Sequence, residues 1–419
     1  MKKTIVFGGV GLAVFLVGGQ LVTQSAYEQN IDGQINYFKQ VLANRDITLS
    51  HQPGERSLFN ASDKVTVTMG KDHSALELFN PQGAFTFTAE NNCTLLPFYL
   101  SCGARFTPVS STAKKIADAY PIDYDAGWSA NILMSSLQSY LVTEQSTITD
   151  FDGKLTLSPL TMQAESDIDL SYFETEINWK GLTLTGSSTG TDVTLGRMQF
   201  TADNERTEHD FYTGEFDADI TDIRIATGVS TMLPTEVRID KLRVSGELEQ
   251  EDDDFYEYEY EFAIDNISTG SSDNVISNVK ADISIDQLSV DLFKTLQTAD
   301  LESSESGLDK ALQVFGQNEH GIEIEELGFF FNEEPVSMHA DLNLAQHTPA
   351  DYDRLGQKLN GQATISISEV LAKSNPVISL VLADQIKKKV VTLNEGKYQA
   401  DLTIKEGQIT ANDQILYQL

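Results

Sequence analysis

Strict alternation of apolar and polar residues is the feature that most restricts how this chain can fold. In residues 255–262 aromatic residues alternate with glutamates, and in residues 336–344 apolar residues alternate with polar ones. A period of two places successive side chains on opposite faces of a β-strand. Each segment therefore has one apolar and one polar face, and the pattern predicts half-buried strands.

Shorter segments with the same period recur from Ile47 onward, separated by clusters of Gly, Asn, Asp and Ser. These segments are residues 65–68, 85–88, 155–157, 182–184, 283–285 and 402–404. Turns rather than helices join most of them, which is typical of antiparallel sheets and not of a parallel α/β sheet. The sequence predicts a mainly β fold that contains an extended antiparallel β-meander.

Helical periodicity returns in the last third of the chain. Helices are predicted over residues 291–299, 307–316 and 351–359. A further helix is predicted to begin at Pro376, after the candidate caps Ser374 and Asn375, and to end near the lysines at 387–389. We therefore expect an α+β C-terminal region over residues 291–419, distinct from an antiparallel β-rich region over residues 47–290.

An uncharged run of nineteen residues, 4–22, follows Lys2 and Lys3. As a helix the run would be about 28 Å long, close to the thickness of a hydrocarbon core. The two lysines precede the run and the first charges after it are acidic, so the positive-inside rule keeps the N-terminus in the cytoplasm. We predict an N-terminal membrane anchor over residues 1–26, a single-pass transmembrane helix in a bacterial inner membrane, with the C-terminal body in the periplasm.

A cleaved signal peptide is the competing interpretation of the same segment. Ser25 or Ala26 would supply the small residue at the cleavage site. The apolar run is longer than the core of an ordinary signal peptide, and this length favours an uncleaved anchor.

An amphipathic helix is expected directly after the anchor, over residues 27–46. Its apolar positions are Ile31, Ile35, Phe38 and Leu42, whose spacing places them on one helical face. We interpret this segment as a membrane-proximal stalk helix that docks against the body or against a second copy of the chain.

Charge and cysteine content exclude some partners and suggest one covalent bond. The chain has 29 Lys and Arg against 63 Asp and Glu, a formal net charge of −34, which disfavours nucleic-acid binding. Cys93 and Cys102 are its only cysteines. In an exported body they are expected to form a disulfide, whose short loop corresponds to about 2–3 kcal/mol of stabilisation.

No catalytic, cofactor-binding or metal-binding residues are predicted. Residues 186–190 match the G-x-S-x-G pattern, but a strand-like segment follows them where a nucleophile elbow needs a helix, so a hairpin turn is favoured. Glu215, Asp217 and Asp219, and also residues 252–254, could collect a hard cation, but solvated acidic surface is the stronger interpretation. The six histidines show no metal-ligand spacing.

Two short segments resemble the YdgA-like family of bacterial inner-membrane proteins. Residues 54–62 (GERSLFNAS) resemble the family's arginine/glycine-aromatic-serine stretch beyond the anchor, and residues 398–412 are similar to its C-terminal hairpin. The first segment is predicted to be a tight turn that buries Leu58 and Phe59 and leaves Arg56 available to pair with acidic neighbours. The family is described as being of unknown function, so the resemblance implies no catalytic residues.

Three classes of function remain. The first is a non-enzymatic envelope protein that contacts the lipid bilayer through residues 4–22 and acts by binding another envelope component, an envelope protein or a second copy of itself. The second is a carrier of lipid or another hydrophobic ligand, in which the apolar faces of the strands line an open groove. The third is an enzyme whose polar residues converge only in the folded chain. No cofactor is expected.

Overall fold

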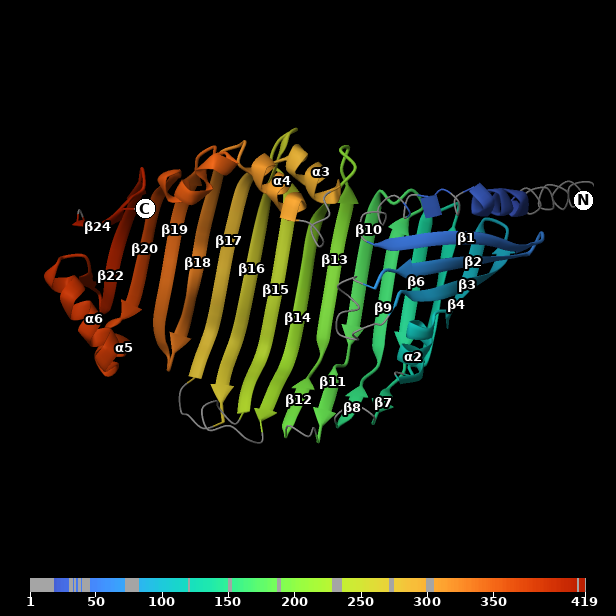
Figure 1. Ribbon diagram of the computed structural model, residues 1–419, viewed down its shortest axis with the longest axis horizontal. Helices are drawn as coiled ribbons and strands as arrows, with labels where there is room; N and C mark the ends of the chain where they lie inside the picture. The colour runs from blue at the N-terminus through green and yellow to red at the C-terminus, as the bar shows by residue number, and fades with distance from the viewer. Residues whose placement is uncertain are drawn as a thin grey trace, which may run out of the picture. The chain divides into compact units, whose positions relative to one another are not determined.

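The chain divides into two compact units of β-strands. Figure 1 shows its helices and strands in a computed structural model. Unit 1 comprises residues 1–150, 156–179 and 300–304, and unit 2 comprises residues 151–155, 180–299 and 305–419. The structure describes residues 19–29, 33, 35, 36, 39, 46–71, 83–119, 121–149, 153–186, 190–227, 236–270, 275–298, 305–412 and 414–418. The predicted mainly β fold is confirmed for these residues.

In unit 1, antiparallel strands are accompanied by a short helix and by a helical segment at residues 19–29. Its elements are β1 (Ile47–Arg56), β2 (Asn60–Met69), β3 (Phe85–Leu96), β4 (Tyr99–Pro108), α2 (Ser111–Ala119), β5 (Tyr124–Asn131), β6 (Ser136–Thr143), β7 (Ser146–Ile148), β9 (Leu160–Asp167) and β10 (Tyr172–Trp179), and β8 (Lys154–Leu157) has residues in both units. From β1 to β6 each strand pairs with the next along the chain, and the sheet continues from β6 to β9 and from β9 to β10. This order is that of a meander in which the chain passes through β7 and β8 between the neighbouring strands β6 and β9.

A helical segment at the start of the described chain packs on the sheet of unit 1. Residues 19–29 are helical, and Tyr27 is only 3% exposed. Tyr27 shares a buried cluster with both cysteines, with Leu95 and Leu100 and with smaller side chains. The core of unit 1 therefore forms between this helix and strands β2 to β5.

Unit 2 is also built of antiparallel strands, the longest of which have 15 or 16 residues. Its strands are β11 (Leu182–Thr185), β12 (Thr191–Leu195), β13 (Met198–Arg206), β14 (Tyr212–Thr227), β15 (Glu236–Gln250), β16 (Phe255–Thr269), β17 (Val275–Ser289), β18 (His320–Phe331), β19 (Glu334–Leu344), β20 (Leu359–Ser368), β21 (Thr392–Asn394), β22 (Lys397–Lys405), β23 (Gln408–Ala411) and β24 (Gln414–Gln418). From β13 to β20 each strand pairs with its successor, and β20 then pairs with β22. The predicted meander is confirmed here.

The helices of unit 2 follow the sequence pattern closely. They are α3 (Val290–Thr298), α4 (Glu305–Phe315), the 3-10 helix η2 (Pro349–Gln357), α5 (Glu369–Ser374) and α6 (Pro376–Lys387). The Asn375 side chain caps α6 by accepting hydrogen bonds from Val377 N and Ile378 N, as its position before Pro376 predicts. Four of these helices were predicted, whereas α5 and α2 of unit 1 were not.

The change of secondary structure near residue 290 is not a break in the sheet. Strand β17 ends at Ser289 and pairs with β18, so α3 and α4 form an excursion between two neighbouring strands. Figure 1 shows these two helices at one end of the long strands. Phe211, Tyr256 and Leu288 from that end of the sheet pack with Val290 and Leu292 of α3 in one buried cluster.

Parts of the N-terminal predictions lie outside the described residues. These parts are residues 4–18 of the predicted span and Ile31, Phe38 and Leu42 of the predicted stalk. Ile35 of the same apolar stripe is described and is 8% exposed. None of the helices in the described part of the chain is both long and apolar enough to cross a membrane.

Candidate functional site

One face of the sheet in unit 2 carries apolar side chains from β14 to β22 without a charged residue in the aligned rows. The cross-strand register, in which opposed residues share a face, produces this arrangement. The central row is Phe216, Gly246, Tyr260, Ile283, Ile324, Ala340, Ala363 and Leu402, and the next row is Ala218, Val244, Phe262, Ala281, Leu327, Met338, Ile365 and Ala400. Eight strands at about 4.8 Å spacing make this surface about 34 Å wide. We call these two rows the apolar face.

The apolar face is only partly removed from water. Most of its larger side chains are half-buried, and Leu327 and Ile365 are 42% and 40% exposed. Helices α3 and α4 cover the adjoining row at one end, where Leu248, Tyr258 and Ile285 pack against their buried cluster. Strand faces of this kind normally meet a second layer, so an apolar surface left accessible over eight strands is a candidate binding surface.

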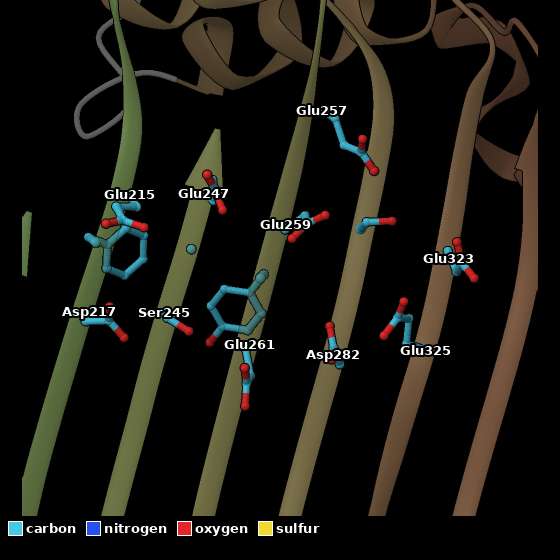
Figure 2. Close-up of a pocket in the computed structure, with 14 residues that line it drawn as sticks. Glu215, Asp217, Ser245, Glu247, Glu257, Glu259, Glu261, Asp282, Glu323 and Glu325 are labelled. Carbon is cyan, nitrogen blue, oxygen red and sulfur yellow. The ribbon is translucent and has the colours of Figure 1, made fainter. Parts of the chain in front are cut away.

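The opposite face of the same strands is acidic, as Figure 2 shows. Asp203, Glu215, Glu247 and Glu259 lie directly opposite one another on four neighbouring strands. A shallow depression of about 360 Å³ lies on this face, lined by carboxylates that include Glu323 and Glu325. Carboxylates spread along a sheet do not converge on one point, and in the described residues no three His, Cys, Asp or Glu side chains form a group that could hold a metal ion.

Hydrogen bonding, burial and like charges raise the pKa of two glutamates on the acidic face. For Glu247 the largest cause is the hydrogen bond with Glu249, followed by burial and by the charges of Glu249, Glu215 and Glu259. For Glu257 it is burial, followed by the charges of Glu259 and others. A carboxyl whose pKa is raised by folding stabilises the fold only when it is protonated, so this contribution is lost as the pH rises through the folded-state pKa.

Replacing Glu247 by glutamine is therefore expected to stabilise unit 2 at pH 7. Removing one of a set of like charges on facing strands should raise the free energy of unfolding by about 0.2–1 kcal/mol. Urea unfolding at pH 7 and at about pH 4 tests this, because the gain should shrink in acid as the wild-type carboxyl takes up its proton. The exposed turn residue Glu406, changed to glutamine, is the matched control; equal gains for both variants at pH 7 would contradict the prediction.

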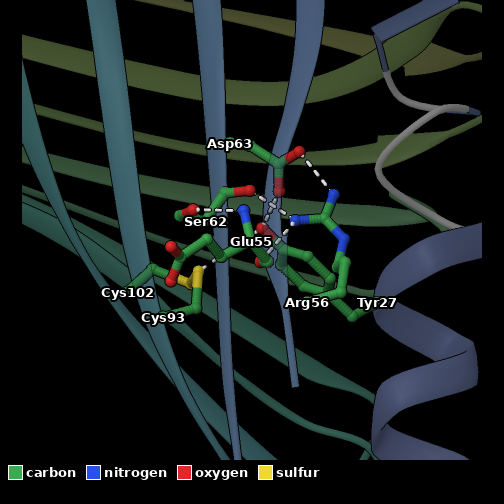
Figure 3. The surroundings of a disulfide bond; sticks show 7 residues. All are labelled: Tyr27, Glu55, Arg56, Ser62, Asp63, Cys93 and Cys102. Atoms are coloured by element: carbon green, nitrogen blue, oxygen red, sulfur yellow. Dashed lines mark hydrogen bonds and ion pairs between the residues drawn. A yellow bond between two sulfur atoms is a disulfide. The ribbon is translucent and has the colours of Figure 1, made fainter.

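Unit 1 contains a buried carboxylate that joins the helix of residues 19–29 to the sheet (Figure 3). Asp63 on β2 has a side chain that is 0% exposed. Its Oδ1 accepts from Arg56 at 2.6 Å and lies 2.7 Å from Nε2 of His51, and its Oδ2 accepts from the hydroxyl of Tyr27. Burial, followed by the hydrogen bond to Asp63 and its charge, raises the pKa of the Tyr27 phenol, so this hydroxyl stays protonated and donating.

Tyr27, His51, Arg56 and Asp63 form what we call the Asp63 cluster. This cluster attaches the helix of residues 19–29 to the sheet and does not present a reactive group. Both carboxylate oxygens already have partners in the cluster, and the guanidinium of Arg56 also covers the Tyr27 ring, 5.2 Å from its centroid. The predicted pairing of Arg56 with an acidic neighbour is confirmed. The sequence did not point to Asp63 or Tyr27, because neither belongs to a motif and they are 36 residues apart.

The predicted burial of Leu58 and Phe59 is wrong. They are 44% and 55% exposed at the tip of the β1–β2 hairpin. The turn itself is tight, as predicted, because Ser57 N donates to Asn60 O. A tight turn at the very end of two strands leaves its central side chains beyond the sheet, so these two residues extend outward.

The two cysteines face each other on neighbouring strands. Cys93 on β3 is directly opposite Cys102 on β4, and the sulfur atoms are bonded at 2.05 Å, as the sequence predicts. Both residues are buried, and Sγ of Cys93 lies 3.5 Å from the Tyr27 hydroxyl oxygen. The disulfide therefore belongs to the same core that holds the helix of residues 19–29.

Unit 1 also contains an apolar cavity of about 400 Å³ beside the Asp63 cluster. Its walls include Ile35, Leu49, Val65, Trp128 and Leu137. The volume falls in the range of pockets that hold small ligands. This cavity is therefore a second apolar surface, besides the apolar face of unit 2, at which a hydrophobic ligand could be sought.

The acidic and glycine-rich segments noted in the sequence have structural roles. Glu215 and Asp217 lie on the acidic face, and Asp252 Oδ1 accepts from Asp254 N and Phe255 N in the turn before β16. Strands β11 and β12 pair antiparallel, which agrees with a hairpin at residues 186–190, although residues 187–189 lie outside the described chain. Likewise, β22 and β23 form the predicted C-terminal hairpin, with Glu406 and Gly407 at positive φ in its turn.

Comparison with known proteins gives a family without an assigned activity. A family model described as bacterial protein of unknown function (DUF945) matches residues 121–416, which is more than half of the chain. No curated protein and no solved structure matches. The matched segment includes all of the apolar and acidic faces of unit 2. The chain therefore belongs to this bacterial family of proteins of unknown function.

Proposed function

We propose that this chain is a non-enzymatic, membrane-anchored envelope protein that holds the hydrocarbon part of lipids against the apolar face of unit 2. The accessible apolar face from β14 to β22 is the observation that carries the proposal. In this proposal the chain is a YdgA-like protein, residues 4–22 cross the bacterial inner membrane once, and the body lies in the periplasm. The anchor would keep the apolar face near a supply of lipid.

Acyl chains fit the apolar face better than a protein partner does. The two rows offer aliphatic and aromatic side chains and a single glycine, Gly246. A protein surface that docked there would have to bury its own polar backbone and side-chain groups against partners that cannot bond them. Hydrocarbon has no such groups, and its burial gives about 25 cal/mol for each Å² removed from water. A second copy of the chain, placed face to face, is the principal rival occupant.

Photo-crosslinking can locate the lipid. The full chain would be reconstituted in vesicles that contain a phospholipid with a diazirine on its acyl chain, and crosslinked peptides would be mapped by mass spectrometry. We expect crosslinks on β14 to β22 at residues of the apolar face. Crosslinks confined to the cavity of unit 1, or dimers without lipid in native mass spectrometry, would overturn this assignment.

Charges placed on the apolar face should weaken lipid binding. Leu327 and Ile365 flank Met338 and are exposed, so their change to aspartate should leave the sheet folded. A carboxylate beneath an acyl chain loses hydration, and crosslinking is expected to fall about tenfold, equivalent to about 1.4 kcal/mol.

Gln362→Asp with Thr403→Asp is the matched control, because both residues are exposed and project from the other face of the same sheet. The control pair should crosslink as the parent does. An equal loss in both pairs would show that net charge, and not the apolar face, governs the interaction.

A further inference from the structure

The hairpin tips at one end of unit 1 form an apolar rim. The three turns of this rim are residues 57–59 between β1 and β2, residues 97–98 between β3 and β4, and residues 132–135 between β5 and β6. They lie side by side, because Leu95 N donates to Phe59 O and Ile132 N donates to Phe98 O. None of the three turns contains a charged residue, in a chain whose net charge is −34.

The rim exposes large apolar side chains to solvent. The exposed fractions at or beside these turns are 44% for Leu58, 55% for Phe59, 47% for Leu96, 39% for Tyr99, 67% for Leu133 and 74% for Met134. Side chains of this size at the ends of strands add nothing to the core of unit 1. Their concentration on adjacent turns indicates a surface that is covered by something apolar.

The chain itself shows what lies next to the rim. Residues 19–23 are bonded to the turns and to the end of β3 beside them: Gln20 Nε2 donates to Leu58 O, Phe98 N donates to Gly19 O, and Thr23 Oγ1 donates to Leu96 O at 2.9 Å. Gly19 approaches the ring of Phe98 so closely that a Cβ at this position would lie 2.3 Å from it. The uncharged run of residues 4–22 therefore ends on the rim.

The length of this run determines how deep the rim must lie. Residues 4–18 alone, as a helix, would be about 22 Å long, which is shorter than a hydrocarbon core of about 30 Å. The run reaches about 28 Å only if residues 19–22 are also at membrane depth. Leu21 and Val22, which are 56% and 46% exposed, are suited to that position. Since residues 19–23 are bonded to the turns, the turns must then lie at the membrane surface.

We propose that the rim, formed by the turns at 57–59, 97–98 and 132–135, inserts into the lipid interface beside the anchor. This inference rests on the anchoring part of the proposed function and is independent of lipid binding by unit 2. The aromatic residues at the tips, Phe59 and Tyr99, have the chemistry that favours the boundary between headgroups and acyl chains. The rim would fix unit 1 against the bilayer instead of leaving it on a flexible tether.

Tryptophan quenching by brominated lipid tests the position of the rim. Phe59→Trp and Met134→Trp would be made in the full chain and reconstituted in vesicles of phosphatidylethanolamine and phosphatidylglycerol with brominated acyl chains. Val142→Trp is the matched control, because Val142 is 38% exposed at the far end of β6, about 20 Å along the strand from the turn. Trp128 and Trp179 remain in every protein, and the parent provides their baseline.

The added emission of the two rim variants is expected to fall by about half relative to unbrominated vesicles, whereas that of Val142→Trp should stay unchanged. Flotation after an alkaline wash separates the two possible failures. A chain that does not float would overturn the anchor and with it the rim. A chain that floats but shows no quenching at residues 59 and 134, or equal quenching at residue 142, would overturn the rim alone.

Discussion

Replacing Asp63 by asparagine is expected to lower the free energy of unfolding of unit 1 by about 3 kcal/mol, the lower end of the range for breaking a buried ion pair. The lower end applies because the Arg56 side chain is 23% exposed and can recover some hydration once its partner is neutral. The change also weakens the acceptor for the Tyr27 hydroxyl, which fastens the helix of residues 19–29. Urea unfolding of the full chain measures the loss, and limited proteolysis within residues 19–29 reports whether the helix is released.

Two comparisons make the Asp63 experiment specific. Asp123→Asn changes the same group at an exposed position of unit 1 and should have an effect near zero. Combining Asp63→Asn with Arg56→Gln should cost less than the sum of the two single changes, because each single change leaves the other group without its partner. A loss below about 1 kcal/mol for Asp63→Asn would mean that the cluster does not hold the helix.

Replacing Tyr256 by alanine is expected to destabilise unit 2 by about 3–5 kcal/mol, the range for deleting a buried aromatic ring. Tyr256 is 0% exposed and meets the rings of Phe211 and Phe293 edge to face, with centroids 5.0 and 5.5 Å away. Its removal opens a cavity where α3 meets the sheet. Thermal and urea unfolding measure the effect.

Tyr260→Ala is the matched control for Tyr256. Tyr260 is on the same strand and the same face but is half-buried in the apolar face, beyond the cluster with α3. Its loss should cost less than half as much, because little dense packing is removed. Similar losses for the two variants would mean that Tyr260 is covered as fully as Tyr256, which would contradict the accessible apolar face.

Strands were predictable from the sequence because alternation is a local property. Residues 255–262 and 336–344 lie in β16 and β19 with the predicted two faces. The start of α6 was predictable for the same reason, since Asn375 and Pro376 act within one helical turn. By contrast, the sequence pattern predicted neither α2 nor α5, and α5 has only six residues.

Features that depend on contacts between distant parts of the chain could not be predicted in this way. The same alternation describes a sheet covered by a second layer and a sheet left accessible, so the apolar face became visible only from the register and exposure of β14 to β22. The Asp63 cluster depends on a contact between residues far apart in the chain. The outward direction of Leu58 and Phe59 depends on where the turn lies relative to the sheet edge and not on their hydrophobicity.

The chain-order pairing of β13 to β20 has a consequence for how unit 2 is assembled. Each new strand needs only its immediate predecessor, so the sheet can grow strand by strand from one hairpin, and the excursion through α3 and α4 between β17 and β18 is the longest connection that it has to close. Local contacts of this kind favour rapid folding. A chain that becomes available from its N-terminus onward could therefore add its strands in sequence order. At each step the last strand of the partly formed sheet would be an open edge to which the next strand pairs.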